Sequence, residues 1–277
     1  MTNSQLFSNK TYIKHVYRYE EKIRDFKVGR EHVVIVLETG VVAAQLIGMS
    51  NIMDCSLKEI AHLKGFSNLT PNLVALSWSI LVDNCQVMAC PSLHGESDSM
   101  ELITLSDLKT VETKALNIRN ISYMALSYGA ALVATVDEQS NTISVYSIKG
   151  NTELLNQFKQ RENGQVDFLK FNGNSNYLVS SKNSKHVMIY KLRIKASSSI
   201  LNKFSEEKEF AYIVKPEEVK TYRVVGFSEN HDSFVGVFLQ DDLMNIRLFE
   251  IDQDKGGECR QVMMFNAASK ESDEFQL

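Results

Sequence analysis

The sequence that decides the fold is residues 121–148, ISYMALSYGAALVATVDEQSNTISVYSI, with a second copy at residues 166–194, VDFLKFNGNSNYLVSSKNSKHVMIYKLRI. Each copy contains three short runs rich in β-branched and aromatic residues, separated by polar breaks of Gly, Asn and Ser. When Tyr146 is aligned with Tyr190, the second copy lies 44 residues after the first. A repeat of this length with three or four strands is typical of one blade of a β-propeller.

Similar groups of short apolar runs recur on both sides of these two copies. Further cores are expected within residues 25–46, 73–105 and 222–251, and no long run with helical periodicity interrupts them. We therefore predict an all-β, WD-repeat-like β-propeller, a single domain over residues 1–277 with about five recognisable blades. A pair of β-sandwich domains is the alternative, which the recurring inner-strand triplets disfavour.

Three polar segments are expected to lie outside the blades. Residues 1–10 and 267–277 are predicted to be disordered tails. Residues 195–209 interrupt the strand pattern for longest, and we predict an exposed inter-strand loop there.

The composition argues against several classes of partner and site. The net charge of -4 and the pI near 5.9 give no general attraction to nucleic acid, so no nucleic-acid partner is expected. The N-terminal residues lack the apolar run of a signal peptide, and no apolar segment is long enough to span a membrane, so we expect a cytoplasmic protein. The cysteines form no Cys-x-x-Cys pair, and reduced thiols without a bound metal are expected. They are Cys55, Cys85, Cys90 and Cys259.

The usual enzyme signatures are missing from the sequence. It contains no Gly-rich phosphate loop, no Gly-x-Ser-x-Gly elbow and no His-Glu-x-x-His motif. His94 and Glu96 come nearest to a site, but a solvated turn is the favoured interpretation. We predict that the protein is not an enzyme and needs no cofactor. Basic residues do concentrate between Lys182 and Lys195, either as a solvated face or as an anion-binding rim.

Several segments, in order along the chain, resemble the PROPPIN (WIPI-type) family of propellers. The segments are residues 70–77 (TPNLVALS), 134–146 (ATVDEQSNTISVY), 154–158 (LLNQF) and 256–259 (GGEC). The resemblance implies a propeller that binds phosphatidylinositol 3-phosphate and phosphatidylinositol 3,5-bisphosphate and acts in autophagy. It also implies other autophagy or trafficking proteins as partners, and peripheral association with preautophagosomal, endosomal or vacuolar membranes.

The expected number of blades departs from this family, whose rings have seven. The chain begins at what resembles the end of the second blade core. We therefore expect a ring that is incomplete, closed in an atypical way, or completed by a partner.

The lipid motif departs from the family as well. Where the family has Phe-Arg-Arg-Gly, this sequence has Phe158 followed by Lys159, Gln160 and Arg161. Lys159 keeps a charge without the bidentate fork of arginine, and Gln160 loses the charge. Asp137 adds a negative charge where the family has Ser.

The resemblance leaves a degenerate set of candidate lipid-binding residues. They are Thr135, Lys159, Arg161, Ser181 and Lys185. We therefore predict a non-catalytic adaptor in autophagy-type membrane trafficking whose lipid binding is weak or lost. The alternative is a working phosphoinositide effector recruited to autophagic or endosomal membranes.

Overall fold

The computed structural model describes most of the chain in fourteen segments. They are residues 18–29, 31–47, 56–64, 70–77, 86–92, 99–105, 110–115, 120–148, 151–160, 164–184, 186–192, 209–214, 219–230 and 234–266. Both predicted tails and nearly all of the predicted loop 195–209 lie outside these residues, as do the candidate residues Arg161 and Lys185. The predictions made for them remain predictions.

The described residues form five sheets, which we number in chain order. The first sheet has the order β1 (Ile23–Val28), β2 (His32–Leu37), β3 (Gly40–Ile47), β4 (Ser56–Lys64). A short 3-10 turn at Pro71–Leu73 precedes the second sheet, β5 (Ala75–Leu76), β6 (Val87–Pro91), β7 (Ser99–Thr104), β8 (Thr110–Ala115). The two sequence copies, residues 121–148 and 166–194, supply the first three strands of the third sheet and of the fourth sheet.

The third sheet consists of β9 (Ile121–Leu126), β10 (Leu132–Asp137), β11 (Thr142–Ser147) and β12 (Glu153–Lys159). The fourth consists of β13 (Val166–Phe171), β14 (Tyr177–Lys182), β15 (His186–Lys191), β16 (Ala211–Ile213) and β20 (Gly257–Glu258). The fifth consists of β17 (Tyr222–Asn230), β18 (Phe234–Asp241), β19 (Asn245–Glu250) and β21 (Arg260–Asn266).

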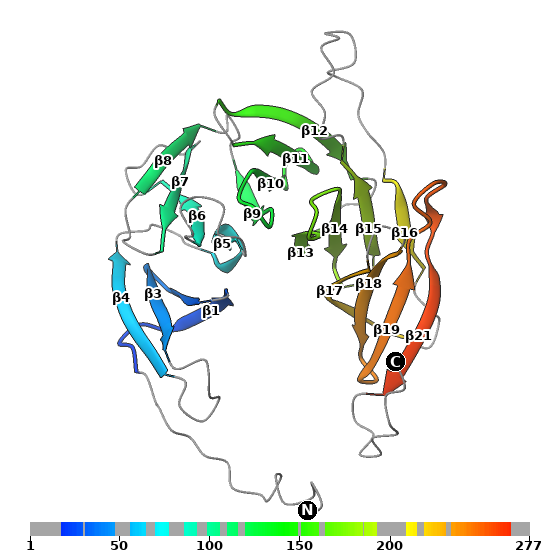
Figure 1. Ribbon diagram of the computed structural model, residues 1–277, viewed down its shortest axis with the longest axis horizontal. Helices are drawn as coiled ribbons and strands as arrows, with labels where there is room; N and C mark the ends of the chain where they lie inside the picture. Colours follow the sequence, from blue (N-terminus) through cyan, green and yellow to red (C-terminus); the bar gives the residue numbers. More distant parts are fainter. Residues whose placement is uncertain are drawn as a thin grey trace, which may run out of the picture.

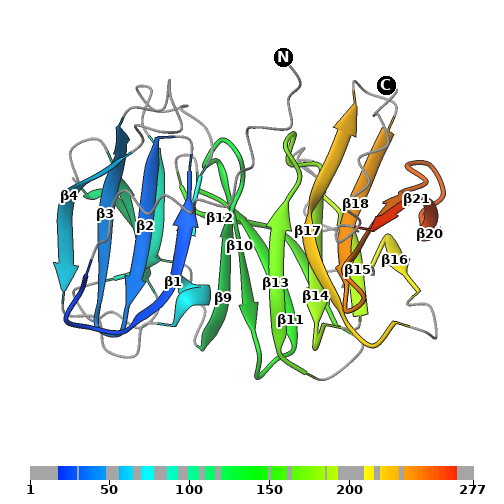
Figure 2. The same cartoon turned by 90° about the horizontal axis from the view of Figure 1, so that it is seen from below.

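The five sheets follow one another around an arc. The innermost strand of each sheet, β1, β5, β9, β13 or β17, lies nearest the centre, and the first and fifth sheets lie at the two ends (Figure 1). Seen from the side, the strands of successive sheets stand next to one another (Figure 2). The predicted all-β propeller architecture is confirmed.

The core lies between neighbouring sheets, which explains why the strands read as continuous apolar runs. Along β10, Val133 packs in the cluster shared with the second sheet, whereas Ala134 and Val136 pack in the cluster shared with the fourth. Likewise in β14, Leu178 faces the third sheet and Val179 faces the fifth. Because successive side chains of a strand point to opposite faces, both faces of such a sheet must be apolar.

The glycines of the GGEC segment make a connection that the sequence did not predict. After β19 the chain returns to the fourth sheet, where Gly257 and Glu258 pair in parallel with β16. Gly256 has φ +65°, and a Cβ there would lie 2.1 Å from the backbone oxygen of Phe210. Only glycine fits this approach without strain, so this residue permits the edge of the fourth sheet to be extended.

Within the segments that the structure describes, no helix is long and apolar enough to cross a membrane. The same segments contain no group of three or more His, Cys, Asp or Glu residues that could hold a metal ion.

Candidate functional site

Thr135 and Lys159 lie on one face of the third sheet, the face directed at the second sheet. The register pairs Thr135 with Ser144, Ser144 with Gln157, and Thr142 with Lys159. Residues directly opposite in antiparallel strands point to the same side, so all of these share a face. Thr135 is fully buried and its hydroxyl has no hydrogen-bond partner among the described residues, whereas Lys159 is exposed.

Asp137 lies on this same face, where β10 ends. Its Oδ1 accepts hydrogen bonds from the backbone N–H groups of Gln139, at 2.9 Å, and Ser140, at 3.2 Å. The carboxylate therefore closes the turn between β10 and β11. Its negative charge stands beside the candidate residues, which is unfavourable for a bound phosphate.

Ser181 points into a different interface. It lies on the same face of β14 as Val179, which packs against the fifth sheet. It is buried, and its hydroxyl likewise has no hydrogen-bond partner among the described residues. Thr135 and Ser181 therefore face two separate inter-sheet spaces, and the structure does not bring the three described candidates, Thr135, Lys159 and Ser181, together into one site.

Lys182, at the end of β14, occupies the interface between the third and fourth sheets. Its side chain is on the face of β14 that contains Leu178, and the residue is only 4% exposed. Its Nζ donates to Oδ1 of Asn141 at 2.6 Å and to Oε1 of Gln160 at 2.8 Å. Asn141 Nδ2 in turn donates to the backbone oxygen of Gln160 at 2.7 Å. A buried ammonium thus joins two sheets through amide oxygens.

The sequence analysis did not single out Lys182, because matching Tyr146 with Tyr190 leaves no gap between the two copies. That alignment matches Asp137 with Ser181. In the structure four residues, 138–141, separate β10 from β11, but three, 183–185, separate β14 from β15. Lys182 is therefore the last residue of its strand, as Asp137 is in the preceding sheet. The turn after β14 is one residue shorter than the turn after β10. A comparison of the two copies that allowed a gap at this turn would have matched Lys182 with Asp137.

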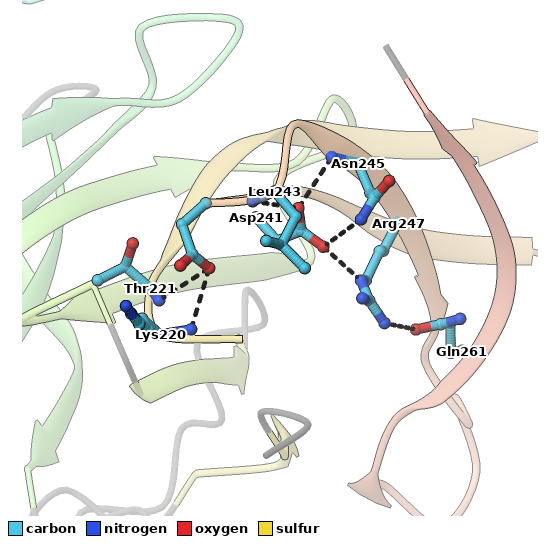
Figure 3. A network of polar contacts seen from close by, with 8 residues as sticks. Lys220, Thr221, Asp241, Leu243, Asn245, Arg247 and Gln261 are labelled. Carbon is cyan, nitrogen blue, oxygen red and sulfur yellow. Dashed lines mark hydrogen bonds and ion pairs between the residues drawn. The ribbon is translucent and has the colours of Figure 1, made fainter. Parts of the chain in front are cut away.

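The fifth sheet has an ion pair in the corresponding place (Figure 3). Asp241 ends β18, and its Oδ2 lies 2.8 Å from Nε of Arg247, with the two side chains 0% and 7% exposed. Asp241 also accepts hydrogen bonds from the backbone N–H of Leu243 at 3.0 Å and from both nitrogens of Asn245 at 2.8 and 3.0 Å. Nη1 of Arg247 donates to Oε1 of Gln261 at 3.1 Å.

These contacts keep the Asp241 side chain ionised. Burial by itself raises the pKa of this carboxyl, but the hydrogen bonds from Asn245 and Arg247 and the charge of Arg247 outweigh burial, so the pKa lies below its ordinary value. The next residue, Asp242, accepts from the backbone N–H of Lys220 at 2.9 Å and ties the turn to the segment that enters β17. This network joins β18, β19, β21 and the entry to β17 within the fifth sheet.

The two cysteines that the structure describes are not suited to nucleophilic chemistry. Burial, with a smaller contribution from Glu101, raises the pKa of Cys90 to about 12. Burial, with a smaller contribution from Glu258, raises the pKa of Cys259 to about 12. Both therefore stay protonated near neutral pH, whereas the thiolate is the reactive form.

Comparison with known proteins gives one sequence relative and several similar structures. No family model matches the sequence. Autophagy-related protein 18 of Caenorhabditis elegans is 24% identical over 181 residues, which are 64% of this chain and 40% of that protein. The matched region thus spans less than half the length of this relative.

Among solved structures, the complex of KlAtg21 with the coiled-coil of AgAtg16 has a TM-score of 0.68 at 18% identity, covering 90% of this chain and 72% of that one. Kluyveromyces lactis Hsv2 has a TM-score of 0.63 at 10% identity, and the match covers 90% of this chain and 75% of Hsv2. A functionally unknown protein of Desulfotomaculum acetoxidans reaches 0.56 at 14% identity, covering 90% and 72%. At such low identities these likenesses establish the fold, and a fold alone does not specify a function.

Proposed function

We propose, from its confirmed resemblance to the PROPPIN propellers, that this chain is a non-catalytic adaptor in autophagy-type membrane trafficking with a degenerate phosphoinositide site. It works in the cytoplasm with other autophagy or trafficking proteins, peripherally on preautophagosomal, endosomal or vacuolar membranes. The complex of KlAtg21 with the coiled-coil of AgAtg16, a similar structure, supports a protein partner for this chain. The observation that carries the lipid part of the proposal is the burial of Lys182 against Gln160.

Gln160 stands where the resemblance places the second arginine of the family's Phe-Arg-Arg-Gly motif. Its side chain is buried and accepts a hydrogen bond from Lys182. To contact a headgroup, Lys182 would have to give up hydrogen bonds to two amide oxygens. Hydrogen bonds of charged groups contribute roughly 1.5–3 kcal/mol each, so a phosphate would first have to offset a loss of similar size to its own contribution. This arrangement favours an interface contact over lipid binding.

The remaining candidate residues offer little to an inositol phosphate. The hydroxyls of Thr135 and Ser181 are buried in separate interfaces, and Asp137 adds a negative charge beside Lys159. A phosphorylated headgroup is held by several convergent cationic donors, arginine above all because its planar fork binds phosphate through two hydrogen bonds. Of the described candidates only Lys159 offers an exposed cation, so we expect weak or no lipid binding.

Flotation with liposomes tests the lipid part of this proposal. Liposomes of phosphatidylcholine with phosphatidylinositol 3-phosphate or phosphatidylinositol 3,5-bisphosphate are compared with phosphatidylcholine alone, at low salt. We expect the wild-type chain to float little more with phosphoinositide than without it. Tight flotation that is lost in the double variant Lys159→Ala and Arg161→Ala would contradict the proposal and establish a phosphoinositide effector. The variant Lys220→Ala and Arg223→Ala removes two positive charges from exposed residues elsewhere and serves as the matched control.

The adaptor part is tested separately by proximity labelling in starved cells. We expect autophagy or trafficking proteins to be labelled equally by the wild type and by the Lys159→Ala and Arg161→Ala variant. Labelling no greater than that of an unrelated propeller would contradict the adaptor role.

A further inference from the structure

The inner strands surround a cavity at the centre of the arc. It has a volume of about 540 Å³ and is lined by residues of β1, β5, β9, β13 and β17, among them the exposed Phe26 and the partly buried Phe168 and Phe227, which also pack against the core of the fourth and fifth sheets. The centre of the arc in Figure 1 is the place where these strands face one another. This volume falls in the range of small-molecule sites, which are also mostly apolar and aromatic.

Two lysines line this cavity, and its lining contains no carboxylate. Lys27 is paired, because its Nζ lies 2.7 Å from Oδ2 of Asp25. Lys170 on β13 is half-buried, and the described residues give it neither a hydrogen bond nor an ion pair. Its ammonium lies over β17, where a Cβ added to Gly226 would be 3.9 Å from Nζ. Among the residues whose side chains the structure describes, Lys170 is therefore a cation without a counter-charge.

Burial of such a cation is unfavourable, and it lowers the pKa of Lys170 below the ordinary value. A ligand that brings a negative charge would relieve this penalty and form a charge-assisted hydrogen bond. Because other residues of the same lining are apolar, we expect the uncharged part of such a ligand to be apolar as well. Phe26, Val28 and Tyr128 line the cavity, yet they are 62%, 47% and 51% exposed.

We propose that this cavity binds a small amphipathic monoanion, with an aromatic body against Phe26, Phe168 and Phe227 and a carboxylate on Nζ of Lys170. A single uncompensated ammonium suits one carboxylate, whereas a highly charged inositol phosphate needs several convergent cationic donors. The site lies on the inner strands. Asp137 and Lys182, by contrast, lie at the ends of the second strands β10 and β14. It would give the propeller a ligand that does not depend on phosphoinositides.

Isothermal titration calorimetry on the full chain with 2-naphthoate, and with its neutral isostere 2-naphthamide, tests this proposal. We expect 2-naphthoate to bind one site, and 2-naphthamide to bind about tenfold or more weakly, because it cannot form the charge-assisted bond. The variant Lys170→Met keeps the apolar stem and should bind both compounds equally. The variant Lys58→Met removes a charge from an exposed residue on the outer strand β4, and it should bind as the wild type does.

The variant Lys170→Met should remain folded, because it removes a half-buried charge. Its thermal unfolding midpoint should therefore be unchanged or raised, and lost binding cannot be attributed to unfolding. A second variant, Phe26→Ala, should weaken both compounds because it removes part of the apolar lining without changing the charge. Three results would each overturn the proposal: no binding of 2-naphthoate at millimolar concentration, equal affinity of the wild type for both compounds, or unchanged 2-naphthoate affinity in Lys170→Met.

Discussion

Asp241→Asn should destabilise the protein by about 3–5 kcal/mol at neutral pH, which is the usual effect of removing one partner of a buried ion pair. The substitution keeps Oδ1, so the hydrogen bonds from the backbone N–H groups of Leu243 and Asn245 survive. It replaces Oδ2, the acceptor for Nε of Arg247, by an amide nitrogen. Two donors then face each other, and the buried guanidinium loses its counter-charge. A loss of this size is a large part of the total stability of an ordinary domain.

Urea unfolding followed by far-ultraviolet circular dichroism measures this loss as a shift of the midpoint. Asp252→Asn is the matched control, because Asp252 also caps a turn, accepting from the backbone N–H groups of Asp254 and Lys255, but is exposed. Its effect should be a small fraction of that at Asp241. The double variant Asp241→Asn and Arg247→Met removes the stranded charge and should recover part of the loss.

The pH dependence gives an independent check on the ion pair. The pKa of Asp241 is lower in the folded protein than in the unfolded chain, where it lies near 4. The stability it contributes is therefore fully present above the unfolded pKa and is lost as the pH falls through the folded pKa. The difference between wild type and Asp241→Asn should accordingly shrink below about pH 4. A loss below about 1 kcal/mol at neutral pH would refute the reasoning, and so would a difference that stays constant on acidification.

Four other expectations follow from the contacts described above. Lys182→Met leaves the amide oxygens of buried Gln160 and part-buried Asn141 without their donor and should lower the unfolding free energy by about 2 kcal/mol, measured in urea. Gly256→Ala forces a Cβ against a carbonyl oxygen at positive φ and should lower the thermal midpoint by several degrees, unlike alanine at an exposed site. Cys90 and Cys259 should react with Ellman's reagent at pH 8 only after unfolding, and fast native reaction would contradict their raised pKa. Trypsin should cut first within residues 195–209, and resistance there would argue against an exposed loop.

The sequence pattern could give only part of the arrangement of the candidate lipid-binding residues, and those residues show why. Alternation along a strand places Thr135 and Lys159 on one face, which the sequence pattern alone would allow. The direction of that face depends on which sheet packs against it. Because Ser181 belongs to the next blade and faces a different neighbour, two residues that look equivalent in the repeat point into separate spaces.

The sequence by itself determined the strands, the repeat and the propeller architecture, because alternating β-branched residues and Gly, Asn and Ser breaks act over a few neighbouring residues. Only the tertiary structure decided that Lys182 ends its strand and is buried against Gln160, since this depends on a turn one residue shorter and on a neighbouring sheet. The same holds for the parallel strand at Gly257 and for the unpaired ammonium of Lys170. Their partners, and the space around them, come from residues distant in the chain, and no local pattern encodes such a neighbour.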